Sequence, residues 1–265
     1  MLSTITPIAA LAALVALPAV SAHGYVSGVV AGGKYYGQSG PNWIYGEKPQ
    51  QASWYANNPD LGFVGSADYN KASIICHIDA TPGTTSIPVK AGSAIDLQWT
   101  TWPDSHHGPV ISYLARCGGG DCSKVNPGSL KFFKIAESGL IDGSAAPGKY
   151  ASDVLIANNG TSTVTIPASV TGDFVLRHEI IALHSAGESG GAQSYPMCIN
   201  LKVSGGGNAH PCKSGADCRA GAALMKTSDP GVLVNIYQTL TSYKIPGPKI
   251  WSGLKKRSFA RSFNA

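Results

Sequence analysis

The sequence has 265 residues and a formal net charge of +5, and only 13% of its residues are charged. Four positive charges lie in the last eleven residues, which contain no acid, so the rest of the chain carries a charge of +1. Nucleic-acid binding needs clustered Lys and Arg on the folded surface, so this balance argues against such a partner and favours an uncharged ligand. Low charge together with 32 glycines is typical of a secreted β protein.

Residues 1–22 have the pattern of a secretory signal, with an apolar run over Ile5–Val20 followed by small residues ending at Ala22. The run is too short and too interrupted by proline to predict a membrane span. Cleavage after Ala22 would make His23 the first residue of a secreted, extracellular protein. A terminal His carries an α-amine and an imidazole that can chelate one metal ion together, although a His can also follow a signal by chance.

An even number of cysteines behind a signal predicts disulfides. Two pairs are separated by short glycine-flanked loops, and the remaining two would join distant segments: Cys117 with Cys122, Cys212 with Cys218, and Cys76 with Cys198. A zinc site is the less favoured alternative, because no two cysteines have the close spacing typical of zinc ligands.

The remaining pattern predicts an all-β fold, a single-domain antiparallel β-sandwich of immunoglobulin-like or fibronectin-like type with long loops and little helix. The domain is expected over residues 23–251, followed by a basic, disordered tail at 252–265. One short helix or turn is expected at 232–238, a glycosylation sequon begins at Asn159, and residues 38–70 form a long aromatic loop of functional or packing character. The expected strands are 24–30, 34–36, 73–76, 94–100, 110–115, 131–135, 163–166, 173–183 and 197–203.

Two further stretches contain candidate metal ligands. His106 and His107 lie in a loop bounded by proline and glycine just before a predicted strand. Adjacent residues do not readily face one site, so we expect one to bind and the other to support it. In the predicted strand 173–183, alternate residues share a face that leads to His184 at the strand end, whereas His178 is interpreted as a core histidine.

Several blocks resemble fungal copper-dependent lytic polysaccharide monooxygenases, most closely the cellulose-active auxiliary activity family nine, formerly classed among glycoside hydrolases. These blocks are His23-Gly24-Tyr25, Asp104 to Val110, Phe132 to Leu140, Leu176 to Glu179 and Gln193-Ser194-Tyr195-Pro196. The resemblance extends from His23 to about Trp251. It implies one copper ion that cycles between Cu(II) and Cu(I).

The resemblance also assigns roles to single residues. It implies that His23 binds copper through its amine and ring, His106 through Nε2, and Tyr195 through a weakly bound phenol oxygen. His184 and Gln193 would donate hydrogen bonds beside the open coordination position. The implied reaction is hydroxylation at C1 or C4 of a β-1,4-glucan such as cellulose, with O2 or H2O2 and an external small-molecule or protein electron donor.

Exposed aromatic side chains would stack on the polysaccharide. Tyr237 matches such a residue of the family, and Tyr45 is a second candidate, beside Trp43. We expect a monomer with no nucleic-acid or membrane partner. Two alternatives remain: a non-catalytic carbohydrate-binding or copper-carrying sandwich, and an endoglucanase, which is disfavoured because no acid pair suits glycoside hydrolysis.

Overall fold

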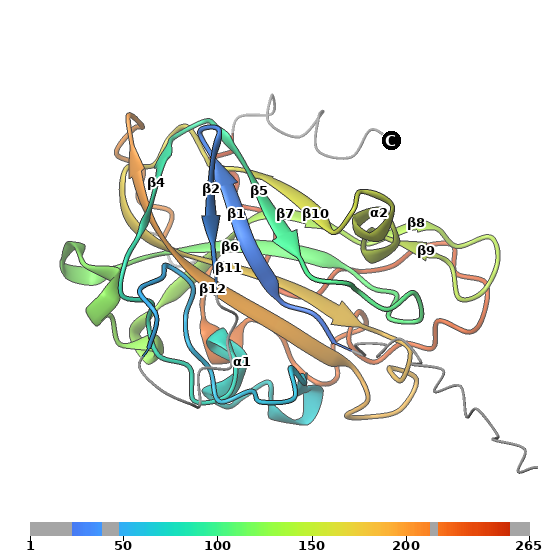
Figure 1. Ribbon diagram of the computed structural model, residues 1–265. Helices are drawn as coiled ribbons and strands as arrows, with labels where there is room; N and C mark the ends of the chain where they lie inside the picture. Colours follow the sequence, from blue (N-terminus) through green and yellow to red (C-terminus); the bar gives the residue numbers. More distant parts are fainter. Residues whose placement is uncertain (1–22, 39–47, 213–216, 255–265) are drawn as a thin grey trace, which may run out of the picture.

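The computed structural model describes residues 23–38, 48–212 and 217–254, and its strands form two mainly antiparallel sheets packed face to face (Figure 1). The smaller sheet has the strand order β10-β5-β1-β2. Its strands are β1 (Val26–Ala31), β2 (Lys34–Gly37), β5 (Ala94–Trp99) and β10 (Thr161–Thr165). The predicted signal at 1–22 and most of the predicted tail, residues 255–265, lie outside the described residues.

The larger sheet has the order β13-β7-β6-β11-β12-β3, and β4 runs parallel to β12. Its longest strands pair over their whole shared length, from Gly172 opposite Val203 to Ala182 opposite Gln193. The strands are β3 (Val64–Gly65), β4 (Ile87–Lys90), β6 (Val110–Arg116), β7 (Lys131–Ser138), β11 (Gly172–Ala182), β12 (Gln193–Ser204) and β13 (Cys218–Ala220). A separate pair is formed by β8 (Leu140–Asp142) and β9 (Lys149–Tyr150).

The side chains of β11 alternate between two cores. Leu176 and Ile180 pack between the sheets with residues of β1 and β5, whereas Val175 and Ile181 face a second core on the other side of the large sheet. This second core includes the short helix α1 (Ser73–Cys76) and residues of the C-terminal segment. The large sheet is therefore covered on both faces, which explains why its central strands are buried along almost their whole length.

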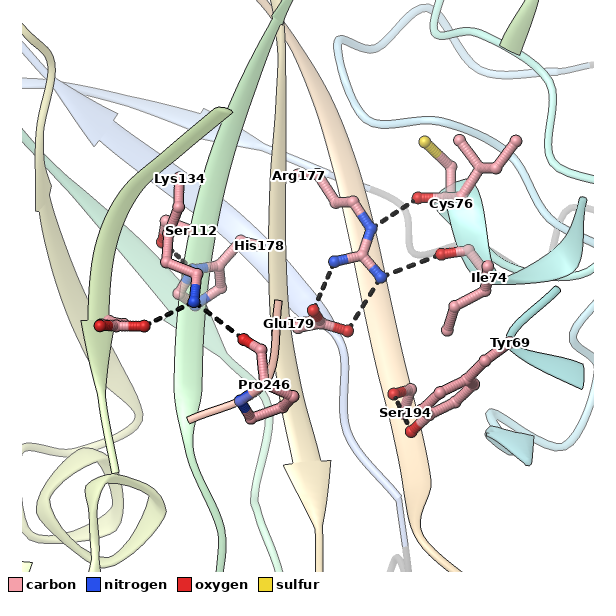
Figure 2. A network of polar contacts seen from close by, with 12 residues as sticks. Tyr69, Ile74, Cys76, Ser112, Lys134, Arg177, His178, Glu179, Ser194 and Pro246 are labelled. Atoms are coloured by element: carbon pink, nitrogen blue, oxygen red, sulfur yellow. Dashed lines mark hydrogen bonds and ion pairs between the residues drawn. The ribbon is translucent and has the colours of Figure 1, made fainter. Parts of the chain in front are cut away.

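Buried charges fasten this outer layer to the sheet (Figure 2). The fully buried guanidinium of Arg177 pairs with Glu179 and donates to the backbone carbonyls of Ile74 and Ile75 on α1. The ammonium of buried Lys134 donates to Glu137 and to the carbonyl of Pro246, at 2.8 Å. These contacts satisfy groups that would otherwise be costly to bury, and they fix α1 and the C-terminal segment against the strands.

All three predicted disulfides are present: Cys76–Cys198, Cys117–Cys122 and Cys212–Cys218. The first joins α1 to β12 across 122 residues of sequence. No free cysteine remains in the described part of the chain, and the alternative of a cysteine zinc site is not supported.

The β-sandwich prediction is confirmed, but one local prediction was wrong. Residues 73–76 form α1 instead of a strand, because Arg177 takes the carbonyls that a strand would offer to a neighbour. The short helix or turn expected at 232–238 is a turn, in which the amides of Val232 and Leu233 donate to the carbonyl of Asp229. It does not extend into a helix, since the amide of Val234 donates to Ala186. The sequence reading also missed the helix α2 (Ala151–Ala157).

Single-turn 3₁₀ helices connect several elements: η1 (Ser66–Asp68), η2 (Gly118–Gly120), η3 (Cys122–Lys124), η4 (Pro127–Ser129) and η5 (Gly221–Ala223). Within the described ranges, the helices are all too short or too polar to cross a membrane.

Candidate metal centre

Three predicted ligands from distant parts of the sequence meet at one end of the sandwich. His23 precedes β1, His106 lies in the loop between β5 and β6, and Tyr195 lies on β12. The ring centroid of His23 is 6.3 Å from that of His106 and 5.9 Å from that of Tyr195. The structure therefore brings together the three side chains that the sequence motifs proposed.

The His106 loop is held against the end of β11. The amide of Leu183 donates to the carbonyl of His107 at 2.9 Å, and that of Ile181 donates to Pro109 at 3.2 Å. Gly108 is required between them, because a Cβ there would lie 1.8 Å from the carbonyl oxygen of Ile181. The close approach of two backbones thus explains the glycine of the motif and sets the position of His106.

The side chain of Trp102 packs against the same loop. The indole of Trp102 donates from Nε1 to the carbonyl of His106 at 3.0 Å. Its ring meets those of Tyr195 and His106 edge to face, with centroids 4.8 Å and 5.8 Å apart. One tryptophan therefore orients two predicted ligands at once.

His107 turns away from His106 and contacts the helix α2. Its Nδ1 lies 2.8 Å and 3.0 Å from the two carboxylate oxygens of Asp153. The same carboxylate accepts the backbone amide of Tyr150 and caps α2. The two adjacent histidines thus have different surroundings, as expected for one ligand and one supporting residue.

His184 and Gln193 lie next to the proposed ligands. The ring of His184 is 4.2 Å from that of His106, with an angle of 36° between the planes. Gln193 accepts the phenol proton of Tyr195 on Oε1, at 3.0 Å. With its oxygen engaged in this way, Gln193 has its amide NH2 left as the donor toward a bound molecule.

The electrostatics keep His106, His184 and Tyr195 neutral. Burial, with smaller contributions from His184, His23 and His107, lowers the pKa of His106 to about 4. The pKa of His184 is also lowered, mainly by burial, and burial raises the pKa of the Tyr195 phenol. Neutral imidazoles keep a lone pair for a metal at neutral pH, and a protonated phenol is a weak ligand.

This donor set fits copper. Nδ1 of His106 lies 3.1 Å from Ser105 Oγ, which leaves Nε2 as the nitrogen for coordination. Imidazole nitrogens suit Cu(II), and the two histidines and one phenol lie close enough to converge on one ion. Among the described residues, no cluster of three or more His, Cys, Asp or Glu side chains has the arrangement of a metal site.

The remaining predicted residues include the substrate-contact and glycosylation candidates. Tyr237 is 61% exposed on the C-terminal segment, Asn159 follows α2 in a turn, and Tyr45 and Trp43 lie outside the described residues. His178 is fully buried between the sheets, with Nδ1 2.8 Å from Ser112 Oγ, and lies against Trp99.

One exposed aromatic was not assigned to the site from the sequence. Phe63 has its ring centroid 6.3 Å from that of His23 and 6.2 Å from that of Tyr195. Its only sequence signal was its place in the long aromatic loop.

The pattern of Auxiliary Activity family 9 (formerly GH61) matches residues 23–244 of this chain. The chain belongs to Auxiliary Activity family 9. This family consists of lytic polysaccharide monooxygenases and is copper-dependent in general. Membership therefore makes the chain an enzyme and sets aside the binding-protein and endoglucanase alternatives.

Individual relatives agree over most of their length. The chain is 55% identical to the AA9 family lytic polysaccharide monooxygenase E of Aspergillus tamarii, over 88% of this chain and 92% of that protein. It is 52% identical to the monooxygenase A of Thermoascus aurantiacus, over 87% of this chain and 100% of that protein. The extended catalytic domain of H. jecorina LPMO9A matches with a TM-score of 0.83 and 44% identity, covering 92% and 96% of the two chains.

Proposed function

We propose that this chain, after removal of residues 1–22, is a secreted enzyme that cleaves β-1,4-glucan, such as cellulose, oxidatively at C1 or C4. The family supplies the reaction class, and the convergence of His23, His106 and Tyr195 carries the assignment to this chain. Hydroxylation of either carbon makes the glycosidic bond break by elimination. The reaction uses O2 or H2O2 and an external electron donor.

One copper ion would be held by the amine and ring of His23, by Nε2 of His106 and by the phenol oxygen of Tyr195. When bound, copper supplies the one-electron redox chemistry that activates O2 or H2O2 toward a C–H bond. The protein holds the His106 imidazole and the Tyr195 phenol neutral, and it holds both rings close to that of His23, so binding needs little rearrangement.

The polar side chains beside the proposed ligands would donate hydrogen bonds to a bound oxygen species and orient it. His184 lies against His106, and the Gln193 amide is directed by its bond from Tyr195, so both can donate hydrogen bonds to a small oxygen species at the site. Tyr237 provides an exposed ring for the sugar chain. The absence of a large charge on the domain is consistent with an uncharged polysaccharide.

The proposal is tested with secreted protein whose N-terminus has been sequenced. Copper-loaded enzyme, a reductant and cellulose should give oxidised oligosaccharides by mass spectrometry, and His106→Ala should give none. A second variant with one residue added before His23 should lose both copper affinity and products. Products without oxidation, or full activity with the extended N-terminus, would overturn the proposal.

A further inference from the structure

The small sheet has an exposed aromatic ring on its outer face. Tyr35 on the edge strand β2 is 57% exposed and pairs with Val30 of β1 (Figure 1). The neighbouring pair, Tyr36 with Val29, packs against the core between the sheets, so Tyr35 and Val30 point away from it. A single exposed apolar side chain needs no explanation, but this ring is held in place by several contacts.

The ring of Tyr35 lies over the backbone of two glycines. A Cβ at Gly28 would overlap the ring, and one at Gly37 would lie 3.4 Å from its Cε1. The two glycines pair with each other across β1 and β2, two positions along from the pair that contains Tyr35. Since neither glycine has a side chain, one face of the ring rests on the sheet and the other face remains open.

The hydroxyl end of the ring is fixed at an irregularity of β1. The pairing of β1 with β5 shifts register between Val26 and Gly28, which places Ser27 at a bulge. The carbonyl of Ser27 accepts the Tyr35 hydroxyl at 3.2 Å and the amide of Gln38 at 2.9 Å. The ring is therefore held along its face and at its tip, and it can meet a ligand with little loss of side-chain entropy.

Polar side chains continue the same face across β5 and β10. Gln98 and Thr161 continue the row of the two glycines, whereas Asp96 and Thr163 continue the row of Tyr35. The Thr161 hydroxyl donates to Oε1 of Gln98 at 3.1 Å, and the Thr163 hydroxyl donates to Oδ1 of Asp96 at 2.6 Å. These bonds leave the Gln98 amide NH2 as a donor and the second Asp96 oxygen as an acceptor toward a ligand.

An open aromatic face followed by a donor and an acceptor suits an uncharged chain rich in hydroxyl groups. The C–H face of a pyranose ring complements the negative face of an aromatic ring, and sugar hydroxyls bond to amides and carboxylates. Strands lie about 4.8 Å apart, so a ligand that reaches from β2 to β5 must extend over about 10 Å. The two rows contain one charged residue, Asp96, so a strongly charged partner finds no matching cluster of charges.

We propose that the outer face of the small sheet is a second, non-catalytic binding site for the β-glucan, with Tyr35 as the stacking residue and Gln98 and Asp96 as hydrogen-bonding residues. This inference rests on the proposed function. The face is continuous with the metal centre through β1, because His23 lies five residues before Gly28, about 17 Å of extended chain. A glucan chain held there keeps the enzyme beside its substrate between reactions.

The first test follows the amide NMR signals of Gly28 and Gly37 in the mature, copper-free protein. Cellohexaose, a soluble β-1,4-glucan oligosaccharide, should shift these signals saturably, because the ring that covers them stacks on the sugar. Tyr35→Leu keeps an apolar cover over the glycines but has no ring, so the saturable shifts should disappear. Tyr35→Phe keeps the ring and should retain them.

The second test measures binding of copper-loaded enzyme to cellulose. Tyr35→Leu should bind about fivefold more weakly, as expected for loss of an aromatic anchor. Gln98→Met has a similar volume but no amide, and it should bind about threefold more weakly. Ile78→Ala is the matched control, because it removes an exposed apolar side chain beside α1, on the other side of the large sheet. This variant should bind as the wild type does.

Thermal unfolding and copper calorimetry accompany both tests, and copper affinity should be unchanged in every variant. If Tyr35→Leu bound cellulose as the wild type does, the ring would serve only to cover the glycines, and the inference would be overturned. Oxidised products from the wild type would in that case leave the proposed function intact. Saturable shifts at Gly28 and Gly37 without any reductant-dependent product would support the binding site and refute the proposed function.

A second copy of the chain is the other occupant that the tests can detect. A dimer of the wild type in sedimentation that Tyr35→Leu dissociates would assign the face to self-association and overturn the glucan site. A monomer whose Gly28 and Gly37 signals respond to cellohexaose would support it. Wild-type cellulose binding by a folded Gln98→Met would refute the hydrogen-bonding role of Gln98.

Discussion

Gly108→Ala offers the sharpest test of how the fold positions the proposed copper ligand His106. A methyl group at Gly108 would lie 1.8 Å from the carbonyl oxygen of Ile181, whereas real Cβ contacts essentially never fall below 3.0 Å. The loop must therefore move by about 1.2 Å, and the bond from Leu183 to His107 must lengthen or break. Misplacement of a reacting group by about 1 Å can cost about 100-fold in rate.

We expect Gly108→Ala to lower copper affinity by about tenfold or more, in line with other changes behind a metal ligand. Overpacking should also reduce the free energy of unfolding by about 2 kcal/mol, which corresponds to about 4–8 °C in a domain of this size. Copper titration calorimetry and thermal unfolding of the metal-free protein measure the two effects separately.

Gly118→Ala is the matched control for Gly108→Ala, because nothing lies within 4 Å of the Cβ that it adds. This variant should bind copper and unfold as the wild type does. If Gly108→Ala also behaved as the wild type in both measurements, the contact with Ile181 would not be what positions His106, and the reasoning from backbone approach would be refuted.

Three further predictions concern protons and buried charges. Burial lowers the pKa of His77 to about 4 and that of His178 to about 3 from an ordinary 6.5. As the pH falls, these two side chains are therefore protonated in the unfolded chain before they are protonated in the folded one. The free energy of unfolding should be highest above about pH 6.5 and should fall toward pH 4, by about 3 kcal/mol for His77. Across this range the urea midpoint of His77→Gln should vary less than that of the wild type. An equally steep pH dependence in the two proteins would contradict the assignment. Lys134→Met leaves the carboxylate of Glu137 and the buried carbonyl of Pro246 without their partner, and it should lower the free energy of unfolding by about 2 kcal/mol. An unchanged denaturation midpoint would exclude a stabilising role for Lys134. His107→Ala and Asp153→Ala should each weaken copper binding about tenfold, because each removes the contact between the ligand loop and α2. Titration curves like those of the wild type would show that this contact is dispensable.

Metal chemistry restricts residue type, so the sequence itself indicated His23 and the adjacent pair His106 and His107 as candidate ligands. A terminal His supplies an amine and a ring together. The choice of His106 and the role of Tyr195 came from the family resemblance. The close approach of two backbones at Gly108 leaves no room for a Cβ, so glycine is required at this position of the motif. Alternation in 173–183 indicated a strand that leads to His184, and β11 ends at Ala182.

Local patterns failed where a distant group decided the conformation. The β-branched residues at 73–76 are typical of a strand, but Arg177, about a hundred residues away, takes two of the helix carbonyls. In this case tertiary hydrogen bonds outweighed intrinsic propensity, which differs by less than 1 kcal/mol per residue for most amino acids. At 232–238 the predicted turn is present, and it ends without a helix because the amide of Val234 donates to Ala186.

The surroundings of Phe63 show why an exposed aromatic beside the metal centre is harder to predict than the ligands themselves. Any of several aromatic residues could stack on a sugar, so its identity signals little, and its placement depends on a carbonyl held by His77 15 residues later. Neither residue belongs to a metal-binding motif. Patterns that identify metal ligands therefore leave the residues around Phe63 unpredicted.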